Sequence, residues 1–381
     1  MPNETLGRFE QVLRFASSRG IAAIHIKPGQ RPLYRRCGTL ISRKDEQTFS
    51  EADLDEIAHG LVPGAWLPNW AAGFDVTFPH GVVGCGRFRL TLLHQRGAVG
   101  VVVHVLPGKA QTLREANLPK VMANWAHLAR GLVLLSGPPG SGRSVTWQAL
   151  IEQVNTAGVA PRHVITLENP IEVLFDDKLA FIRQREIVTD TADLATGLQQ
   201  IARMDCDIVA IGDLPPDHVE SALALAEQGR LVIAVVAGGA PVELIRQLLA
   251  QREPARRDSL RQRLAAQLRG IAYQKLVVTA DGKARVPAVE VATFVPQMLE
   301  VVRGAADVAA LQPFIEQGRA TGNQTLEQSL IELAHQGMIA VDQALAASDS
   351  PDALRHRIAS TTQSGMTSTV TPVARLDEVP F

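Results

Sequence analysis

The sequence predicts an α/β protein in which a nucleotide-binding domain with a parallel sheet follows a smaller α+β domain. Three observations support this prediction. An apolar strand at Leu132–Ser136 runs into a glycine-rich turn and then into a helical pattern over Ser144–Val154. Further apolar strands alternate with helices after this point, whereas the first part of the chain alternates like an antiparallel sheet. The 381 residues are enough for two domains, each with its own core.

The composition is that of a soluble globular protein, with 46% apolar and 20% charged residues. The 38 basic and 39 acidic residues nearly cancel, which argues against a dedicated nucleic-acid-binding protein. Cys37, Cys85 and Cys206 are far apart and form no CxxC pair, so we expect a reducing cytosol and neither a disulfide framework nor a zinc site. The chain starts without a signal pattern, and its longest apolar runs, such as Val99–Val105, are strand-sized. We therefore predict a cytoplasmic protein that reaches a membrane only by docking.

The first domain is predicted over residues 1–107, followed by a linker over 108–120. Helical spacing occurs at Thr5–Ser18 and at Thr48–Leu61, and Ser50 with Asp53 forms a candidate capping box at the head of the second helix. The predicted strands of this domain are Ala23–Lys27, Leu33–Arg36, Phe74–Phe78, Gly86–Gln95 and Gly97–Leu106.

The second domain is predicted over residues 121–358. Its strands are Leu132–Ser136, His163–Leu167, Ile208–Gly212 and Leu231–Val236, with crossover helices between them. Pro241–Lys275 is predicted to be helical, Asp281–Ala284 to form a hairpin-like turn, and Pro313–Ile358 to form further helices. The Ser- and Thr-rich residues 359–381 are predicted to be disordered.

The turn after the first parallel strand has the spacing of a phosphate-binding loop. Gly137, Gly142 and Ser144 fit the pattern Gly-x-x-x-x-Gly-Lys-Ser/Thr, but Arg143 stands in place of the lysine. Backbone N–H groups and a helix N-terminus surround phosphates in such a loop. An arginine can hold phosphate oxygens but is longer and planar, so it cannot occupy the same position as the ammonium group. The predicted nucleotide-binding residues are Gly137, Pro138, Pro139, Gly140, Ser141, Gly142, Arg143, Ser144 and Val145. A glycine-rich turn without a ligand is the alternative.

Several blocks, read in order, resemble the type IV pilus retraction ATPases (the PilT and PilU group) within the type II/IV secretion ATPase superfamily. The resemblance covers about residues 5 to 355. Besides the phosphate loop, its blocks are Gly86–Arg89, Gln95–Gly97, Ile165–Glu172 (the Asp box), Arg183–Glu186, Asp207–Asp213 (Walker B), Gly270–Leu276 and Gly322–Leu326.

The resemblance implies a PAS-like N-terminal domain and a RecA-like ATPase domain that uses ATP and Mg²⁺. It also implies a cytoplasmic ring docked on the inner-membrane pilus platform. That ring would be a homo-hexamer, or a mixed ring or stack with an intact retraction ATPase. No nucleic acid partner is implied. The many arginines between Arg246 and Arg269 are interleaved with acidic residues and lack aromatic neighbours, so they favour a solvated or subunit-facing surface.

The family's catalytic roles transfer to matching positions. Ser144 would give its hydroxyl to Mg²⁺, with Glu168 as a second metal-site residue, and Glu172 is the other acidic position of the Asp box. Asp213 takes the place of the family's general-base glutamate.

Arg87, Arg89 and Arg96 match arginines that reach the nucleotide or stiffen the interface between domains. The alternative for these three is a solvated strand face with ordinary salt bridges.

Four departures from the family affect separate parts of the catalytic apparatus: Arg143, Asp213, His104 in place of an arginine, and Val235–Gly239 in place of Thr-Leu-His-Thr-Asn. Leu214–Pro216 also replaces Met-Arg-Asp, which removes an arginine and stiffens the loop. We therefore predict an accessory protein of the pilus machinery that binds ATP and hydrolyses it weakly or not at all. A slow but active ATPase and a nucleotide-independent scaffold remain as alternatives.

Overall fold

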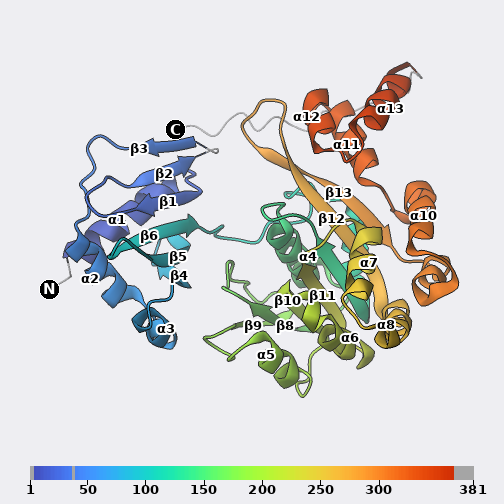
Figure 1. Cartoon of the computed structure of the whole chain (residues 1–381), viewed down its shortest axis with the longest axis horizontal. Coiled ribbons are helices and arrows are strands. Elements are labelled where there is room, and N and C mark those ends of the chain that lie inside the picture. Colours follow the sequence, from blue (N-terminus) through green and yellow to red (C-terminus); the bar gives the residue numbers. More distant parts are fainter. Residues whose placement is uncertain (1–3, 37–38, 364–381) are drawn as a thin grey trace.

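The computed structural model describes residues 4–36 and 39–363, which form two lobes joined by an irregular segment (Figure 1). The N-terminal lobe holds a six-stranded antiparallel sheet in the order β3-β2-β1-β6-β5-β4. The C-terminal lobe holds a seven-stranded sheet in the order β13-β12-β7-β11-β10-β8-β9. The predicted fold class, an α/β phosphate-loop domain behind a small α+β domain, is confirmed.

In the N-terminal lobe, residues alternate between the two faces of the sheet. Phe88, Leu90 and Leu92 are fully buried in the core under the helices, so Arg87 and Arg89 must point to the opposite face. The strands are β1 (Ala23–Ile26), β2 (Leu33–Arg36), β3 (Thr39–Ser42), β4 (Val76–Val82), β5 (Gly86–Gln95) and β6 (Ala98–Val105). The helices are α1 (Glu4–Ser18), α2 (Glu51–Leu61) and α3 (Leu67–Ala71).

Most predicted elements of this lobe are confirmed, but some boundaries differ and the short elements α3 and β3 are additional. The capping box at Ser50 and Asp53 is present, and α2 begins directly after it rather than at Thr48. The strand predicted at Phe74–Phe78 begins at Val76 instead, where pairing with Leu92 of β5 starts. The edge strand β3 was not predicted, because all of its side chains are exposed and so carry no alternation of burial.

The C-terminal sheet is parallel except for β13, and helices cover both of its faces. Leu132 and Leu134 belong to the core under α5, α6, α7 and α8, whereas Val133 and Leu135 pack against α4 on the other face. The strands are β7 (Gly131–Ser136), β8 (His163–Glu168), β9 (Phe181–Glu186), β10 (Ile208–Leu214), β11 (Leu231–Val236), β12 (Leu268–Val278) and β13 (Arg285–Thr293). The helices on this sheet are α4 (Arg143–Ala157), α5 (Leu194–Ile201), α6 (Val219–Glu227), α7 (Pro241–Ala250), α8 (Pro254–Gln267) and α9 (Pro296–Glu300).

The prediction of helix throughout Pro241–Lys275 is wrong in its last part. Helix α8 ends at Gln267, and β12 then pairs in parallel with β7. Strand β9 was missed as well, because its sequence is polar and it lies at the sheet edge beside β8. In both cases the partner strand, rather than the local sequence pattern, decides the conformation.

The last helices pack on the outer part of the β12–β13 hairpin. Leu326, Leu330 and Leu333 form this core with Val277 and Val286. The helices are α10 (Leu311–Gln317), α11 (Leu326–His335), α12 (Val341–Ala347) and α13 (Pro351–Gln363). Because α13 reaches Gln363, the disorder predicted from residue 359 is wrong for 359–363, and residues 364–381 lie outside the described part.

The Gly322–Leu326 block ties these helices to the sheet. Gly322 has φ +80°, and a Cβ there would lie 2.2 Å from Cγ2 of Val121. Buried Asn323 accepts a hydrogen bond from the Thr293 N–H at 2.6 Å, and Thr325 caps α11 through a capping box with Gln328. This block is therefore structural, since it fixes where α11 starts.

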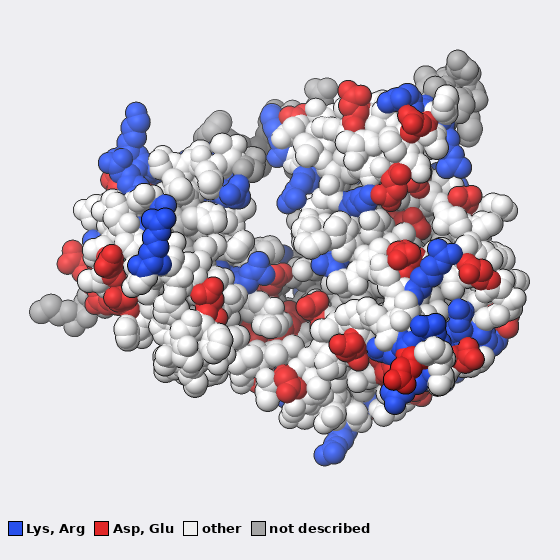
Figure 2. Space-filling model, viewed as in Figure 1, with Lys and Arg blue, Asp and Glu red and all other residues white. Residues whose placement is uncertain are grey.

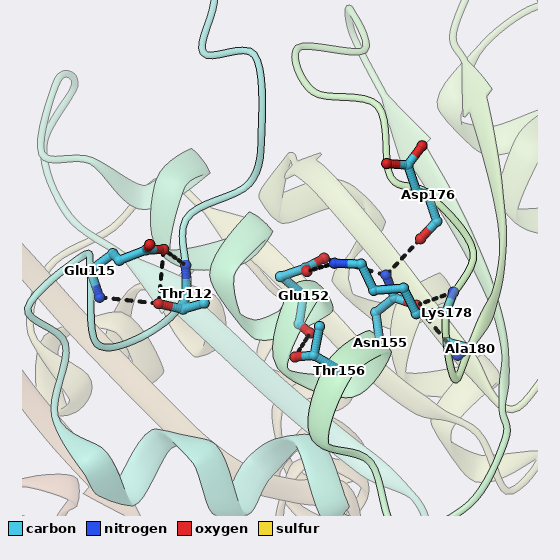
Figure 3. Close-up of polar contacts among 8 residues, drawn as sticks. All are labelled: Thr112, Glu115, Glu152, Asn155, Thr156, Asp176, Lys178 and Ala180. Carbon is cyan, nitrogen blue, oxygen red and sulfur yellow. Dashed lines mark hydrogen bonds and ion pairs between the residues drawn. The ribbon is translucent and has the colours of Figure 1, made fainter.

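Helix α4 is anchored at its C-terminal end by buried Asn155 (Figure 3). Asn155 donates to the Asp176 carbonyl at 2.8 Å and accepts from the Lys178 N–H at 3.1 Å, while the Lys178 ammonium pairs with Glu152. These contacts hold the loop before β9 against the helix. The same view shows the turn of the linker, where the Thr112 hydroxyl donates to Glu115 at 2.9 Å.

We predict that Gly322→Ala lowers the free energy of unfolding by about 2–4 kcal/mol. The new Cβ would clash with Val121, and alanine would be strained in the left-handed backbone conformation. Gly337→Ala is the matched control, since Gly337 has φ +71° and open space around it, and it should cost only the strain. Chemical denaturation of both variants checks this. Equal losses for the two would contradict the packing constraint at Gly322.

Candidate nucleotide site

The phosphate loop connects the end of β7 to the start of α4. Gly137, Gly140 and Gly142 all have positive φ, at 148°, 76° and 86°. A Cβ on Gly137 would lie 2.4 Å from the Gln274 carbonyl oxygen and 2.6 Å from Oγ of Ser141. The backbone therefore follows this tight path only with glycine, as the sequence pattern predicts.

Gln274 of β12 holds the loop from the side and was missed as a site residue. Its Nε2 donates to the Ser141 carbonyl at 2.6 Å, and its Oε1 accepts from the Thr146 hydroxyl at 2.7 Å. The side chain is 4% exposed, so both ends of the amide are paired within the protein. A single amide in the middle of an apolar strand was the available signal, because a buried polar group needs partners.

Arg143, the residue in place of the lysine, is turned toward the neighbouring strand. Its Nη1 donates to the carbonyl of Val236, the last residue of β11, at 2.9 Å. The chain after β11 stays attached to the loop, because Gly137 bridges to Gly238 and the Ser136 hydroxyl donates to the Gly239 carbonyl at 2.8 Å. The Arg143 side chain thus links the start of α4 to the end of β11.

The rest of the loop is accessible to a ligand. Pro138, Pro139, Gly140 and Ser144 are exposed, and Val145 is half-buried. The Ser141 Oγ is buried and has no hydrogen-bond partner in the described part of the chain.

These features fit a phosphate chain lying over the first turn of the 15-residue helix α4. No group of three or more His, Cys, Asp or Glu side chains suited to a metal occurs among residues 4–36 and 39–363.

Glu168, the last residue of β8, is a buried carboxyl group at 3% exposure. It accepts from the Thr166 hydroxyl at 2.6 Å and from Gln184 of β9 at 2.9 Å. Burial raises the pKa of Glu168 to about 7, although these two hydrogen bonds act in the opposite direction. Near neutral pH this group is therefore only partly ionised, which weakens it as a metal ligand. Gln184 is a further supporting residue that sequence reasoning did not identify.

Two of the three predicted arginines cross from the N-terminal lobe to the Asp-box segment. Arg87 donates to the Ile171 carbonyl at 3.2 Å, and Arg89 forms an ion pair with Glu172 at 3.0 Å. The Ile171 N–H in turn donates to buried Glu186 at 3.0 Å. These arginines are thus engaged between lobes and do not lie on a simple solvated strand face.

Arg96 does not join them. It lies exposed in the tight turn between β5 and β6 with φ 51°, seven residues from Arg89, or roughly 24 Å along an extended strand. Asp213 lies at the carboxyl end of β10, next to the strand that ends in Glu168. Its carboxylate is exposed and has no hydrogen bond or ion pair within the described residues.

The arginine-rich surface is a mixture of opposite charges rather than a basic patch. Arg252 pairs with Glu220 at 2.8 Å, and Arg263 pairs with Glu227 at 2.7 Å. Figure 2 shows basic and acidic side chains interleaved over α6 and α8. This supports the interpretation of a solvated or subunit-facing surface. Across the described ranges, none of the helices combines the length and the hydropathy that a bilayer span requires.

Comparison with known proteins gives a consistent group of relatives. Residues 103–378 match the family described as type II/IV secretion system protein. The chain is 28% identical over 348 residues to the type IV pilus ATPase PilU of Pseudomonas aeruginosa, covering 91% of this chain and 90% of that protein. It is 26% identical over 335 residues to the type IV pilus retractation ATPase PilT of the same organism, covering 88% of this chain and 96% of that protein.

Solved structures agree with this grouping. The crystal structure of the pilus retraction motor PilT with bound ADP has a TM-score of 0.81 at 29% identity, covering 91% of this chain and 98% of that chain. The ATPase DotB of Legionella pneumophila has a TM-score of 0.75 at 20% identity, covering 92% of this chain and 95% of that chain, which supports the fold alone.

We predict that Glu168 makes the protein less stable as pH rises through about 7. Its pKa is raised in the folded state, so its stabilising contribution is complete below the unfolded pKa. The contribution falls as the unfolded chain ionises first, and it is gone once the pH passes the folded pKa of about 7. The slope is about 1.4 kcal/mol per pH unit between roughly pH 5 and 6.5.

The test compares Glu290→Gln with the double variant Glu168→Gln/Glu290→Gln, because burial raises the pKa of Glu290 to about 7 as well. Denaturant titrations at several pH values should give a flatter profile for the double variant. Parallel profiles would rule out the titration of Glu168 in this range.

Proposed function

Since this chain belongs to the type II/IV secretion system protein family, we propose that it is an accessory, nucleotide-binding member of the pilus retraction group. The family match and the similarity of this chain to the PilU and PilT proteins agree with the resemblance seen in the sequence. In this proposal the protein binds ATP and hydrolyses it weakly or not at all. It would modulate an intact retraction motor rather than drive retraction itself.

The observation that carries the proposal is the contrast between the loop backbone and the cation within it. The glycines, the Gln274 contacts and the exposed start of α4 retain the features of a phosphate cradle. Arg143, however, donates to the Val236 carbonyl instead of projecting freely over the loop. Binding needs chiefly the backbone, whereas turnover needs cations placed on the transferring phosphoryl group.

The residue at the position of the general base also favours weak turnover. Asp213 is one methylene shorter than the glutamate of the family pattern, and its carboxylate faces solvent without a positioning partner among the described residues. A displacement of ~1 Å from a productive position can cost on the order of 10²-fold in rate. Ala237–Gly239 offers no side-chain donor at the His-box position.

The assembly and the location form part of the proposal. We propose a homo-hexamer, or a mixed ring or stack with an intact retraction ATPase, in the cytoplasm at the inner-membrane pilus platform. The mixed charges over α6 and α8 suit contact with a protein subunit, because Arg252 and Arg263 are already paired with carboxylates. Mg²⁺ would enter with the nucleotide and contact Ser144.

A slow but active ATPase is the second candidate, and one observation favours it. Glu168 has a pKa of about 7 at the carboxyl edge of the sheet, which suits a general base at neutral pH. One observation speaks against this candidate. The Glu168 carboxyl group accepts hydrogen bonds from Thr166 and Gln184, and these bonds hold it inside the protein.

We predict that ATP raises the thermal midpoint of the full chain while steady-state turnover stays at least about 100-fold below that of an intact relative. Differential scanning fluorimetry and a phosphate-release assay on one preparation check both parts. Turnover equal to the intact relative would support the motor candidate. The absence of any nucleotide-dependent shift would support a scaffold.

The variant Arg143→Lys/Asp213→Glu/Ala237→His restores the family residues at three positions and should raise turnover by at least tenfold. Ala237 is exposed, so the larger side chain meets no packed core there. Arg143→Lys/Ala237→His, which lacks the change at Asp213, is the matched control. If all versions turn over equally slowly, the defect lies outside these residues.

A further inference from the structure

The end of the pocket that would receive a third phosphate differs from the rest of the loop. Backbone N–H groups of a phosphate loop surround the α- and β-phosphates, whereas its lysine reaches between the β- and γ-phosphates. In this chain the corresponding side chain is already engaged, because Arg143 Nη1 donates to the Val236 carbonyl at 2.9 Å. The guanidinium is planar and rigid, so this bond also fixes the direction of its remaining donors.

The segment after β11 is packed against the phosphate loop and contributes no side-chain donor. A Cβ on Gly238 would lie 2.5 Å from Cδ1 of Leu244, and a Cβ on Gly239 would lie 2.9 Å from Cγ of Glu243. A side chain added at either glycine would therefore require the facing Leu244 or Glu243 side chain of α7 to shift. The Gly137–Gly238 bridge and the Ser136–Gly239 bond hold the same segment on the loop side.

The other charged groups at this edge of the sheet do not compensate. Arg87 and Arg89 from the N-terminal lobe are engaged by the Ile171 carbonyl and by Glu172. Asp213 adds an exposed carboxylate at the end of β10. A γ-phosphate would add negative charge where Arg143, Arg87 and Arg89 already have acceptors within the protein, and the exposed Asp213 carboxylate supplies no cation, so its binding gains little.

From these contacts we propose that the pocket recognises the diphosphate part of a nucleotide and binds ADP at least as well as ATP, with Arg143 as the specificity-determining residue. The inference rests on the proposed nucleotide binding and goes beyond it. A subunit of this kind keeps the same conformation whether its nucleotide carries two or three phosphates. In a ring or stack it would act as a fixed element beside subunits that cycle.

The first test measures ADP and ATP binding to the full chain by isothermal titration calorimetry, with and without Mg²⁺. We expect the two dissociation constants to agree within about threefold, or ADP to bind more tightly. ATP binding at least tenfold tighter than ADP would overturn this inference while leaving the proposed nucleotide binding intact. Binding of neither nucleotide would overturn both.

The second test changes the residue that carries the specificity. In Arg143→Lys the shorter side chain gives up the planar contact with Val236 and presents a point charge, so we expect the preference for ATP over ADP to rise by at least tenfold. Arg143→Met should weaken the binding of ADP and of ATP by a similar factor. Arg114→Lys, at an exposed linker arginine, is the matched control and should leave both dissociation constants unchanged.

A third readout does not depend on affinity. The backbone amides of residues 237–240 should be protected from hydrogen exchange to the same extent in the ADP and ATP complexes of the wild-type chain. In Arg143→Lys we expect the two complexes to differ there. A wild-type segment that responds to the γ-phosphate, or an Arg143→Lys variant with an unchanged ATP-to-ADP ratio, would refute the role assigned to Arg143.

Discussion

The hydrogen bond from Arg143 to the Val236 carbonyl is the interaction on which the character of this site depends. It joins the first residue of α4 to the last residue of β11, beside the strand that leads into the phosphate loop. A lysine at this position would have a single flexible charge to offer a ligand, whereas the arginine fork can satisfy a backbone acceptor. One substitution thus keeps the loop in shape and removes its most mobile cation.

The lobes are joined by a second constraint, the two-residue alternation of β5. Phe88, Leu90 and Leu92 must enter the N-terminal core, so Arg87 and Arg89 have to face the other lobe. They meet the Asp-box segment, whose backbone is also held by Glu186. The contact between the lobes is therefore a network in which Arg87 and Arg89 each have an acceptor within the protein.

Some elements of this protein are encoded in a local pattern and can be predicted from it, whereas others depend on pairing with a distant strand. The phosphate loop, the Ser50 capping box and β11 follow from glycine spacing, capping chemistry and an apolar run. The local sequence predicts helix for most of β12, whereas its strand conformation comes from pairing with β7, more than a hundred residues earlier in the chain. The role of Gln274 was missed for the same reason, since both of its partners lie in the phosphate loop and α4.

By itself the sequence determined the fold class, the position of the phosphate loop and the list of substituted catalytic positions, because these depend on residue identity and short spacing. Only the tertiary structure decided which acceptor Arg143 contacts, that Arg87 and Arg89 cross between lobes, and that Arg96 does not join them. The physical reason is that a charged side chain takes the best available partner in space. That partner is set by how strands and lobes pack, which no local pattern records.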